Sequence, residues 1–306
     1  MPDYPYKKLV NQNPSATFLH GHRSCSGCGS ALAIRHILET LGNDIVVVNA
    51  TGCMEIVSTP FPESAWSVSY VHSLFENVPA VASGVSRALK NLGKKGTVVG
   101  IGGDGSSYDI GVGALSGAME RNEDYIYICY DNECYANTGI QRSAATPFSG
   151  ATTTSPKEVG GKGEWKKNLP FIAAAHAVPY VATASIGFLP DLKNKLLKAK
   201  SKKGFRFLHV HAPGPLEWAF DPSKTLEMAR LAVNTGMWNL FEIEDGVFKR
   251  SYKPSKLAPL EDYVKAQGRF RHETPEQLEK MKAHIARAQE ELDKLEKAQL
   301  NFEYFL

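Results

Sequence analysis

The sequence predicts an α/β fold with a doubly wound, mostly parallel sheet and a helical extension at its C-terminal end. Short apolar runs rich in β-branched residues recur along the first 240 residues, and segments with helical periodicity separate them. Two of these runs end in glycines and small polar residues, as strands do where they pass into a ligand-binding turn. The alternation of strand and helix favours parallel pairing, because each connection has to cross back over the sheet.

Strands are expected where the apolar runs are continuous, since a strand buried on both faces has no polar side. These runs lie at 44–53, 96–105, 124–132, 180–185 and 205–213. The segments between them have apolar residues at helical spacing, and glycines at 42 and 93 end two of them. The expected helices cover 29–42, 76–92, 109–121, 168–177 and 190–200, with a further helix after Pro222.

The C-terminal segment is charged along most of its length. Thr274 and Pro275 form a helix start, and the spacing predicts a helix over 274–299. Its apolar residues form a narrow stripe: Leu278, Met281, Ile285, Leu292 and Leu295. A helix packed on its own domain and an arm that contacts another subunit both fit this stripe. We therefore predict a domain over 1–240 and an extension over 241–306.

The composition of the 306 residues is that of an ordinary globular protein, with 43% apolar and 22% charged residues. The formal net charge is +3 and no basic block stands out, so we expect no nucleic-acid partner. The N-terminal residues have no apolar signal-peptide core, and no apolar run is long enough to cross a bilayer. We therefore expect a cytoplasmic location without a membrane partner. Five cysteines are an odd set, which argues against a disulfide framework.

The run over 96–105 ends in the sequence GGDG, where glycines let a backbone approach a phosphate group. Asp104 would repel a phosphate directly, so its place in this turn favours a divalent cation between the two anions. Asn132 ends the next strand and offers an amide oxygen, and the backbone carbonyl of Cys134 offers a third ligand. Mg²⁺ prefers such oxygen ligands. The alternative is a tight turn in which Asp104 only caps the following helix.

Cys25 and Cys28 lie three positions apart in the sequence HRSCSGCGS, and Cys53 ends the sequence NATGC. From the residues alone, this set fits a zinc site completed by His72 or His211, a redox-active dithiol, or iron–sulfur ligands. A dithiol would leave Cys53 without a role.

Four long motifs dominate the first half of the chain: GHRSCSGCGSALAIRHIL, VVNATGCMEIVSTPFP, GDGSSYDIGVGALSGAMERN and YDNECYANTGIQRSAATPFSGATTTSP. On these motifs the chain resembles the thiamine-diphosphate-binding β subunits of 2-oxoacid:ferredoxin oxidoreductases, above all of pyruvate:ferredoxin oxidoreductase. With the further matches ATASIG and AFDPSKTLEMARLAVNTGMW they cover most of residues 20–240, and VKAQGRFRHETPEQL extends the resemblance into the tail. The resemblance implies a sheet of the thiamine-diphosphate-binding type.

The resemblance also implies a set of cofactor residues. The diphosphate and Mg²⁺ would be held by Gly103, Asp104, Gly105, Asn132 and the Cys134 carbonyl. The rest of the cofactor and the substrate would lie beside Thr51, Gly52, Asn137 and Thr138. Asn137 is thereby the candidate catalytic residue.

The reaction and its partners follow from the same resemblance. Thiamine diphosphate accepts the electron pair left when a 2-oxoacid loses CO₂. A [4Fe-4S] cluster would carry the electrons toward ferredoxin, and coenzyme A would take the acyl group. The carboxylate that activates the cofactor belongs to another subunit, so the chain would be active only with α-, γ- and δ-type partner subunits. Pyruvate is the expected substrate, while oxalate, phenylglyoxylate and branched-chain acids remain open.

The resemblance assigns Cys25, Cys28 and Cys53 to the cluster, but the fourth ligand is missing. The family usually has a further cysteine after the last strand, where this chain has Gly214 in HAPGPLEW. Four-cysteine ligation is the norm for such clusters. The remaining options are a three-iron cluster, loss of the cluster, or another fourth ligand: water, a partner residue, His211 or Glu217.

Two rival functions remain open from the sequence. A non-redox thiamine-dependent decarboxylase or synthase subunit would need Asp104 and Asn132 but no set of three thiols. A zinc-stabilised assembly subunit would need the thiols but no bound cofactor.

Overall fold

The structure is a computed structural model that describes residues 17–298. Within these residues the chain forms one eight-stranded sheet in the order β2-β1-β3-β4-β6-β5-β7-β8, and all neighbours from β2 to β5 pair in parallel. The strands are β1 Ile45–Ala50, β2 Ser69–Ser73, β3 Thr97–Gly103, β4 Tyr125–Asp131, β5 Tyr180–Ser185, β6 Phe205–His211, β7 Leu240–Glu244 and β8 Val247–Tyr252. The predicted α/β class with a mostly parallel sheet is confirmed.

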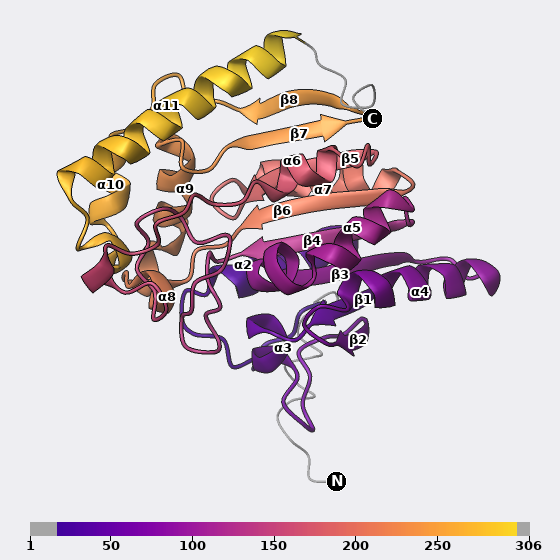
Figure 1. Cartoon of the computed structure of the whole chain (residues 1–306). Helices are drawn as coiled ribbons and strands as arrows, with labels where there is room; N and C mark the ends of the chain where they lie inside the picture. The colour runs from indigo at the N-terminus through magenta and orange to yellow at the C-terminus, as the bar shows by residue number, and fades with distance from the viewer. Residues whose placement is uncertain (1–16, 299–306) are drawn as a thin grey trace.

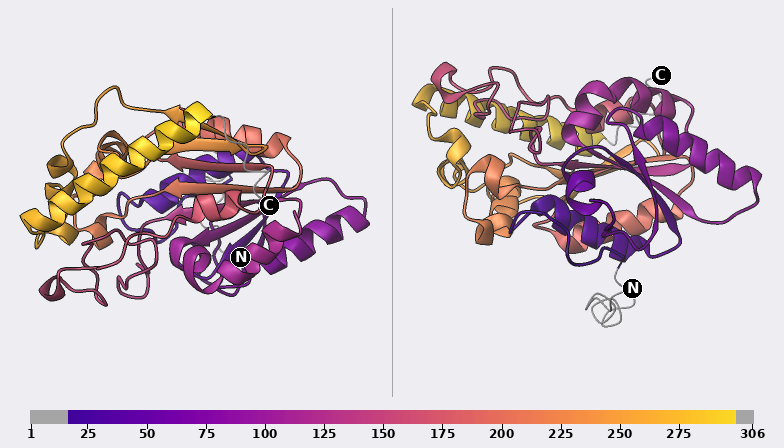
Figure 2. Two further views of the ribbon diagram at one scale, coloured as in Figure 1. Left: turned by 45° about the horizontal axis from the view of Figure 1, so that its top comes forward. Right: turned by 90° about the horizontal axis from the view of Figure 1, so that it is seen from below.

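Helices cover both faces of the sheet, as the doubly wound prediction requires (Figure 1). The longer ones are α2 Gly29–Leu41, α4 Val78–Asn91, α5 Val112–Glu120, α7 Leu189–Ser201, α9 Thr225–Asn234 and α11 Pro275–Ala298. The shorter ones are α3 Cys53–Ser58, α6 Leu169–Ala174, α8 Pro215–Trp218 and α10 Leu260–Lys265. In the right-hand view of Figure 2 the sheet passes between the indigo α2 and the purple α4 and α5.

Each face of the sheet has its own apolar core, which explains why helices pack on both faces. On one face, α2 and α7 bury residues such as Ile34 and Leu196 against the side chains of Val99 and Ile128. On the other face, α4, α5 and α6 pack on a surface that includes Tyr127. Because successive strand residues point to opposite faces, each central strand supplies both cores and its sequence is apolar throughout.

Two departures from the sequence prediction bear on the site and on the domain boundary. The helix expected over 109–121 begins earlier, with a π-helical turn over Gly105–Ile110 that leads into α5. At the other end, β7 begins at Leu240 and pairs antiparallel with β5, and β8 pairs antiparallel with β7. Residues 240–252 therefore continue the sheet, while the domain boundary placed at 240 stays a prediction.

The helix predicted over 274–299 is present as α11, which runs beside β8 at the edge of the sheet (Figure 1). Its apolar stripe is buried on this domain at Met281, Ile285 and Leu292. The buried guanidinium of Arg250 on β8 donates to Glu296 Oε2 at 2.8 Å and also contacts Asp293. In the described part of the chain, no helix is both long and apolar enough to cross a membrane.

We expect Arg250→Met to loosen the C-terminal half of α11, because Arg250 is the buried member of this ion-pair group. Hydrogen exchange of the assembled protein should become faster in α11 and stay unchanged in β4 and β6. Lys253→Met is the matched control, since Lys253 pairs with Asp293 but is about half exposed. Equal exchange in α11 of the Arg250 variant and the wild type would contradict this account of how α11 docks.

Candidate functional site

A cavity of about 290 Å³ lies where β1, β3 and β4 end. Parallel neighbouring strands bring their carboxyl ends to the same edge, so three distant segments meet there. The residues predicted for the cofactor and for Mg²⁺ all line this cavity: Thr51, Gly52, Gly103, Asp104, Gly105, Asn132, Cys134, Asn137 and Thr138. Cys53 lines it too. The fold therefore brings these residues together, while their individual roles as ligands stay predictions.

The glycine turn after β3 is packed too tightly for a side chain. A Cβ atom on Gly105 would lie 2.2 Å from Cε1 of Tyr135. Tyr135 and Phe75 also line the cavity, with ring centroids 5.8 Å apart. The π-helical turn that starts at Gly105 is a feature that often marks functional sites.

Asp104 lies at the buried end of this turn, where only 2% of it is exposed. Burial raises the pKa of its carboxyl group, and the negative charge of nearby Asp131 raises it further. The Ser143 hydroxyl donates a hydrogen bond to Asp104 Oδ2. A divalent cation beside Asp104 would favour the ionised carboxylate, so the donor set fits Mg²⁺ bound by oxygen.

The loop after β4 turns sharply at Glu133, which has a left-handed backbone with φ of 65°. Non-glycine residues adopt this conformation only when the surroundings hold them in it. The Glu133 carboxylate is paired with Lys166 at 3.0 Å and with Arg269 at 2.7 Å, and its N–H donates to Asp131 Oδ1. These contacts hold the turn that puts Asn132 and Cys134 against the same cavity.

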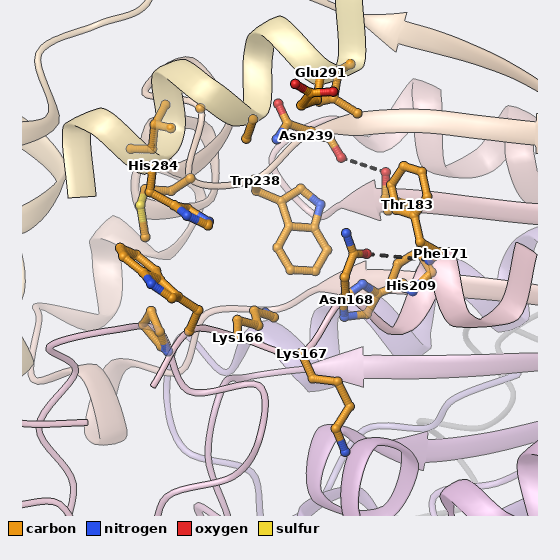
Figure 3. A pocket seen from close by; sticks show the side chains of 18 of the residues that line it. Lys166, Lys167, Asn168, Phe171, Thr183, His209, Trp238, Asn239, His284 and Glu291 are labelled. Atoms are coloured by element: carbon orange, nitrogen blue, oxygen red, sulfur yellow. Dashed lines mark hydrogen bonds between the residues drawn. The ribbon is translucent and has the colours of Figure 1, made fainter. Parts of the chain in front are cut away.

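Lys166 is the centre of a buried charge cluster beneath the site. Its ammonium lies 2.6 Å from Asp131 Oδ2, and His209 Nε2 lies 2.6 Å from the same oxygen. Although burial by itself would raise the pKa of Asp131, Lys166 and His209 hold it well below its usual range. Figure 3 shows Lys166 below the indole of Trp238, and its Nζ lies 4.6 Å from that ring's centroid.

A larger cavity of about 420 Å³ lies on the other side of this cluster, under α11. Its walls include Trp165, which stacks on His284 with ring centroids 3.9 Å apart, and Trp238 (Figure 3). None of the residues predicted for the site lines it. The sequence analysis missed Lys166, which pairs with Asp131 and Glu133 next to the predicted site. Its only signal in the sequence is a lysine pair in a polar loop.

The rim of the predicted site is more open. Asn137 and Thr138 are exposed, and the backbone N–H of Asn137 hydrogen-bonds to the Cys53 thiol. The Thr51 hydroxyl lies 2.8 Å from Nε2 of His72. Cys53 thus lines the cofactor cavity beside the rim residue Asn137.

Cys25 and Cys28 lie in a turn that leads directly into α2. The Cys28 side chain caps this helix by accepting from the N–H of Ala31 at 3.4 Å. The hydrogen bond from Cys28 lowers the pKa of Cys25 to about 7, and burial raises the pKa of Cys53 to about 12. All three thiols are free in the structure. Cys25 and Cys28 border a separate cavity of about 320 Å³.

In the residues that the structure describes, no three His, Cys, Asp or Glu side chains converge on a point where a single metal ion would be held. The two histidines considered for zinc both have other surroundings. His72 contacts Thr51 and lies 3.9 Å from Glu55. His211 is buried between Trp218 and Trp238. The zinc alternative therefore receives no support from either histidine.

Comparison with known proteins places this site in a family. The family described as "Thiamine pyrophosphate enzyme, C-terminal TPP binding domain" matches residues 50–210. The chain is 52% identical over 283 residues to "Pyruvate synthase subunit PorB" of Methanothermobacter thermautotrophicus, which covers 91% of this chain and 98% of the relative. It is 42% identical over 291 residues to "Ketoisovalerate oxidoreductase subunit VorB" of Pyrococcus abyssi, covering 91% of this chain and 93% of that relative.

Among solved structures, "2-oxoglutarate:ferredoxin oxidoreductase from Magnetococcus marinus with 2-oxoglutarate, coenzyme A and succinyl-CoA bound" is similar in fold. Its TM-score is 0.56 at 21% sequence identity, over 75% of this chain and 81% of that chain. Fold, site and relatives together define a thiamine-diphosphate enzyme subunit. The chain belongs to the β-subunit family of the 2-oxoacid oxidoreductases, with pyruvate synthase subunits among its relatives. The predicted resemblance is thereby confirmed, and the protein is an oxidoreductase subunit.

The charge cluster around Lys166 predicts how the stability of the protein depends on pH. The lowered pKa values of Asp131 and Glu133 mean that their contribution to stability is present above the ordinary carboxyl pKa of about 4 and is lost as the pH falls through the lowered values. Lys166→Met leaves the buried carboxylate of Asp131 without its ammonium partner, and leaves Glu133 paired with Arg269 alone. We expect a loss of roughly 3–5 kcal/mol near neutral pH.

In this variant, burial raises the pKa of the Asp131 carboxyl group, so its stability should fall as the pH rises from about 5 to about 8. The wild type should vary little over the same range. Thermal unfolding of the assembled protein at both pH values measures the difference, with the exposed Lys256→Met as control. An equal shift of the midpoint at both pH values would contradict the proposed role of Lys166.

Proposed function

We propose that the chain is the subunit that holds thiamine diphosphate and Mg²⁺ in a 2-oxoacid:ferredoxin oxidoreductase, and that pyruvate is the substrate. The observation that carries the proposal is the cavity at the ends of β1, β3 and β4, which collects the residues of three separate motifs. Pyruvate is favoured because the relatives at 52% identity are named pyruvate synthase subunits. The relative named for ketoisovalerate, at 42% identity, supports the same class of substrate.

The residues present fit a diphosphate with its cation. Gly103 and Gly105 line the cavity with backbone that a phosphate can approach, and Asp104 and Asn132, which line it too, offer oxygen ligands for Mg²⁺. The Cys134 carbonyl would complete the set. Asn137 at the rim would position the substrate's polar groups near the cofactor.

Thiamine diphosphate, when bound, supplies an electron sink that lets a 2-oxoacid lose CO₂. The aromatic rings of Phe75 and Tyr135 exclude water from one side of the cavity. Water exclusion strengthens electrostatic interactions in the site and favours loss of the substrate's negative charge as CO₂. The side chains of this chain thus bind and orient the cofactor, while the carboxylate that activates it belongs to a partner subunit.

The thiols make the reaction oxidative rather than a simple decarboxylation. Cys25, Cys28 and Cys53 would bind an iron–sulfur cluster beside the cofactor and carry electrons toward ferredoxin, with the acyl group passing to coenzyme A. A cluster's thiolates bind separate iron atoms, so they need not converge on one point as the ligands of a single ion do. A non-redox decarboxylase would need no such thiols, and they therefore disfavour it. Partner subunits of the α, γ and δ types complete the enzyme.

The Mg²⁺ assignment predicts that Asp104→Ala abolishes retention of thiamine diphosphate in the assembled enzyme and leaves the fold largely intact. Asp104→Asn should lose most of the cofactor as well, because an amide keeps the size of the side chain but not its charge. Cofactor content after gel filtration and circular dichroism measure the two effects. Asp262→Ala, an exposed aspartate on α10, is the control. Full cofactor content in both Asp104 variants would refute the assignment.

The redox role predicts that Cys28→Ser lowers the iron content of the purified complex and removes one cluster signal from its electron paramagnetic resonance spectrum. Thiamine diphosphate should be retained, because Cys28 does not line the cofactor cavity. Cys129→Ser is the matched control, since Cys129 lies inside β4. An unchanged iron content in the Cys28 variant would leave the chain without a redox role.

A further inference from the structure

Gly214 has no room for a side chain, and the reason is the carboxylate of Glu217. A Cβ atom on Gly214 would lie 1.7 Å from Oε1, 1.9 Å from Cδ and 2.4 Å from Oε2 of Glu217. Gly214 precedes α8, and Glu217 lies in the first turn of that helix. The carboxylate therefore occupies the space in which a side chain at position 214 would begin.

The charge of the same carboxylate acts on all three thiols. After burial, the charge of Glu217 is the next contribution that raises the pKa of Cys53. For Cys25 and Cys28, the hydrogen bond between the two thiols has the largest effect on the pKa. The charge of Glu217 raises the pKa of both thiols. Four groups that become anionic repel one another unless a positive centre lies between them. Glu217 is thus an acidic group whose charge acts on Cys25, Cys28 and Cys53.

Glu217 is also held in place by the cofactor site. Asn132 Nδ2 donates to Glu217 Oε1 at 2.9 Å and lies 3.9 Å from the sulfur of Cys53. This hydrogen bond orients the carboxylate, which has Oε2 as a second oxygen to offer. A side chain with fixed orientation loses little conformational freedom when it binds a metal.

His211, the other nearby candidate for the fourth ligand, lies in different surroundings. Its ring is 1% exposed, and its centroid lies 4.6 Å from that of Trp238. Burial lowers the pKa of His211 to about 3, and the charges that act on it are those of the cluster around Lys166.

We propose that Glu217 is the fourth protein ligand of the iron–sulfur cluster, in the place of the cysteine that Gly214 replaces. The proposal rests on the proposed function, because it presumes that Cys25, Cys28 and Cys53 bind a cluster. A carboxylate is a harder ligand than a thiolate and suits cluster iron less well. The iron bound to Glu217 is accordingly the one most easily lost: one-electron oxidation by ferricyanide and release of one Fe²⁺ convert [4Fe-4S]²⁺ to [3Fe-4S]⁺.

The test uses the assembled complex, purified without oxygen. Glu217→Ala should contain about one iron fewer per copy of this chain and show the paramagnetic signal of a three-iron cluster in the oxidised state. Glu217→Gln should show the same loss while it keeps an acceptor for Asn132. The double variant Gly214→Cys/Glu217→Ala should regain the iron, and should lose less of it than the wild type on ferricyanide oxidation. Glu227→Ala, an exposed glutamate on α9, is the matched control.

Full iron content and an unchanged spectrum in both Glu217 variants would overturn the proposal, even where Cys28→Ser still loses iron. Loss of iron in neither the Cys28 nor the Glu217 variants would instead refute the proposed redox function. Thiamine diphosphate content and circular dichroism separate both results from misfolding. Failure of the double variant to regain iron, with its fold intact, would show that Glu217 stabilises the site without binding iron.

Discussion

The ammonium of Lys166 lies between the carboxylates of Asp131 and Glu133, and the cofactor cavity depends on this buried ion pair. The chain leaves β4 at Asp131 and has to turn through a left-handed residue at Glu133, an unfavourable conformation for a residue with a Cβ atom. Without a cation, two neighbouring carboxylates so deeply buried would repel each other and take up protons. Lys166 removes that repulsion, and the turn can then direct Asn132 and Cys134 to one cavity.

The strands that the sequence predicted well are those buried on both faces. β5 matches its predicted range of 180–185 residue for residue, and all six of its residues are buried. β2 and β8 lie at the edges of the sheet and have exposed positions, so neither contains such a run. The β7–β8 hairpin did carry a signal, since Asp245 and Gly246 form the dipeptide typical of a two-residue hairpin turn.

The candidate site was predictable only as far as it follows strand ends. Asp104 and Asn132 come directly after neighbouring parallel strands, so the fold class itself brings them together. Lys166 reaches Glu133 from a loop and Arg269 from a short 3₁₀ helix over Gly268–Phe270, and no local pattern indicates where these distant segments pack. Glu217 was one of several open options for a missing ligand. What singles it out is the space beside Gly214, which depends on how α8 is placed and is invisible in the sequence.

Asn132 links the cofactor cavity to the Cys53 thiol and the Glu217 carboxylate, because its carboxamide has a donor end and an acceptor end. The donor end of Asn132 faces Glu217 Oε1 and the sulfur of Cys53, groups that are anionic when ionised. Its acceptor oxygen is thereby left for the opposite side, where a cation beside Asp104 would be attracted to it. An aspartate at 132 would place a negative charge against Glu217 and lose this polarity. The end of β4 thus places Asn132 in contact with both the Cys53 thiol and the Glu217 carboxylate at the cofactor cavity.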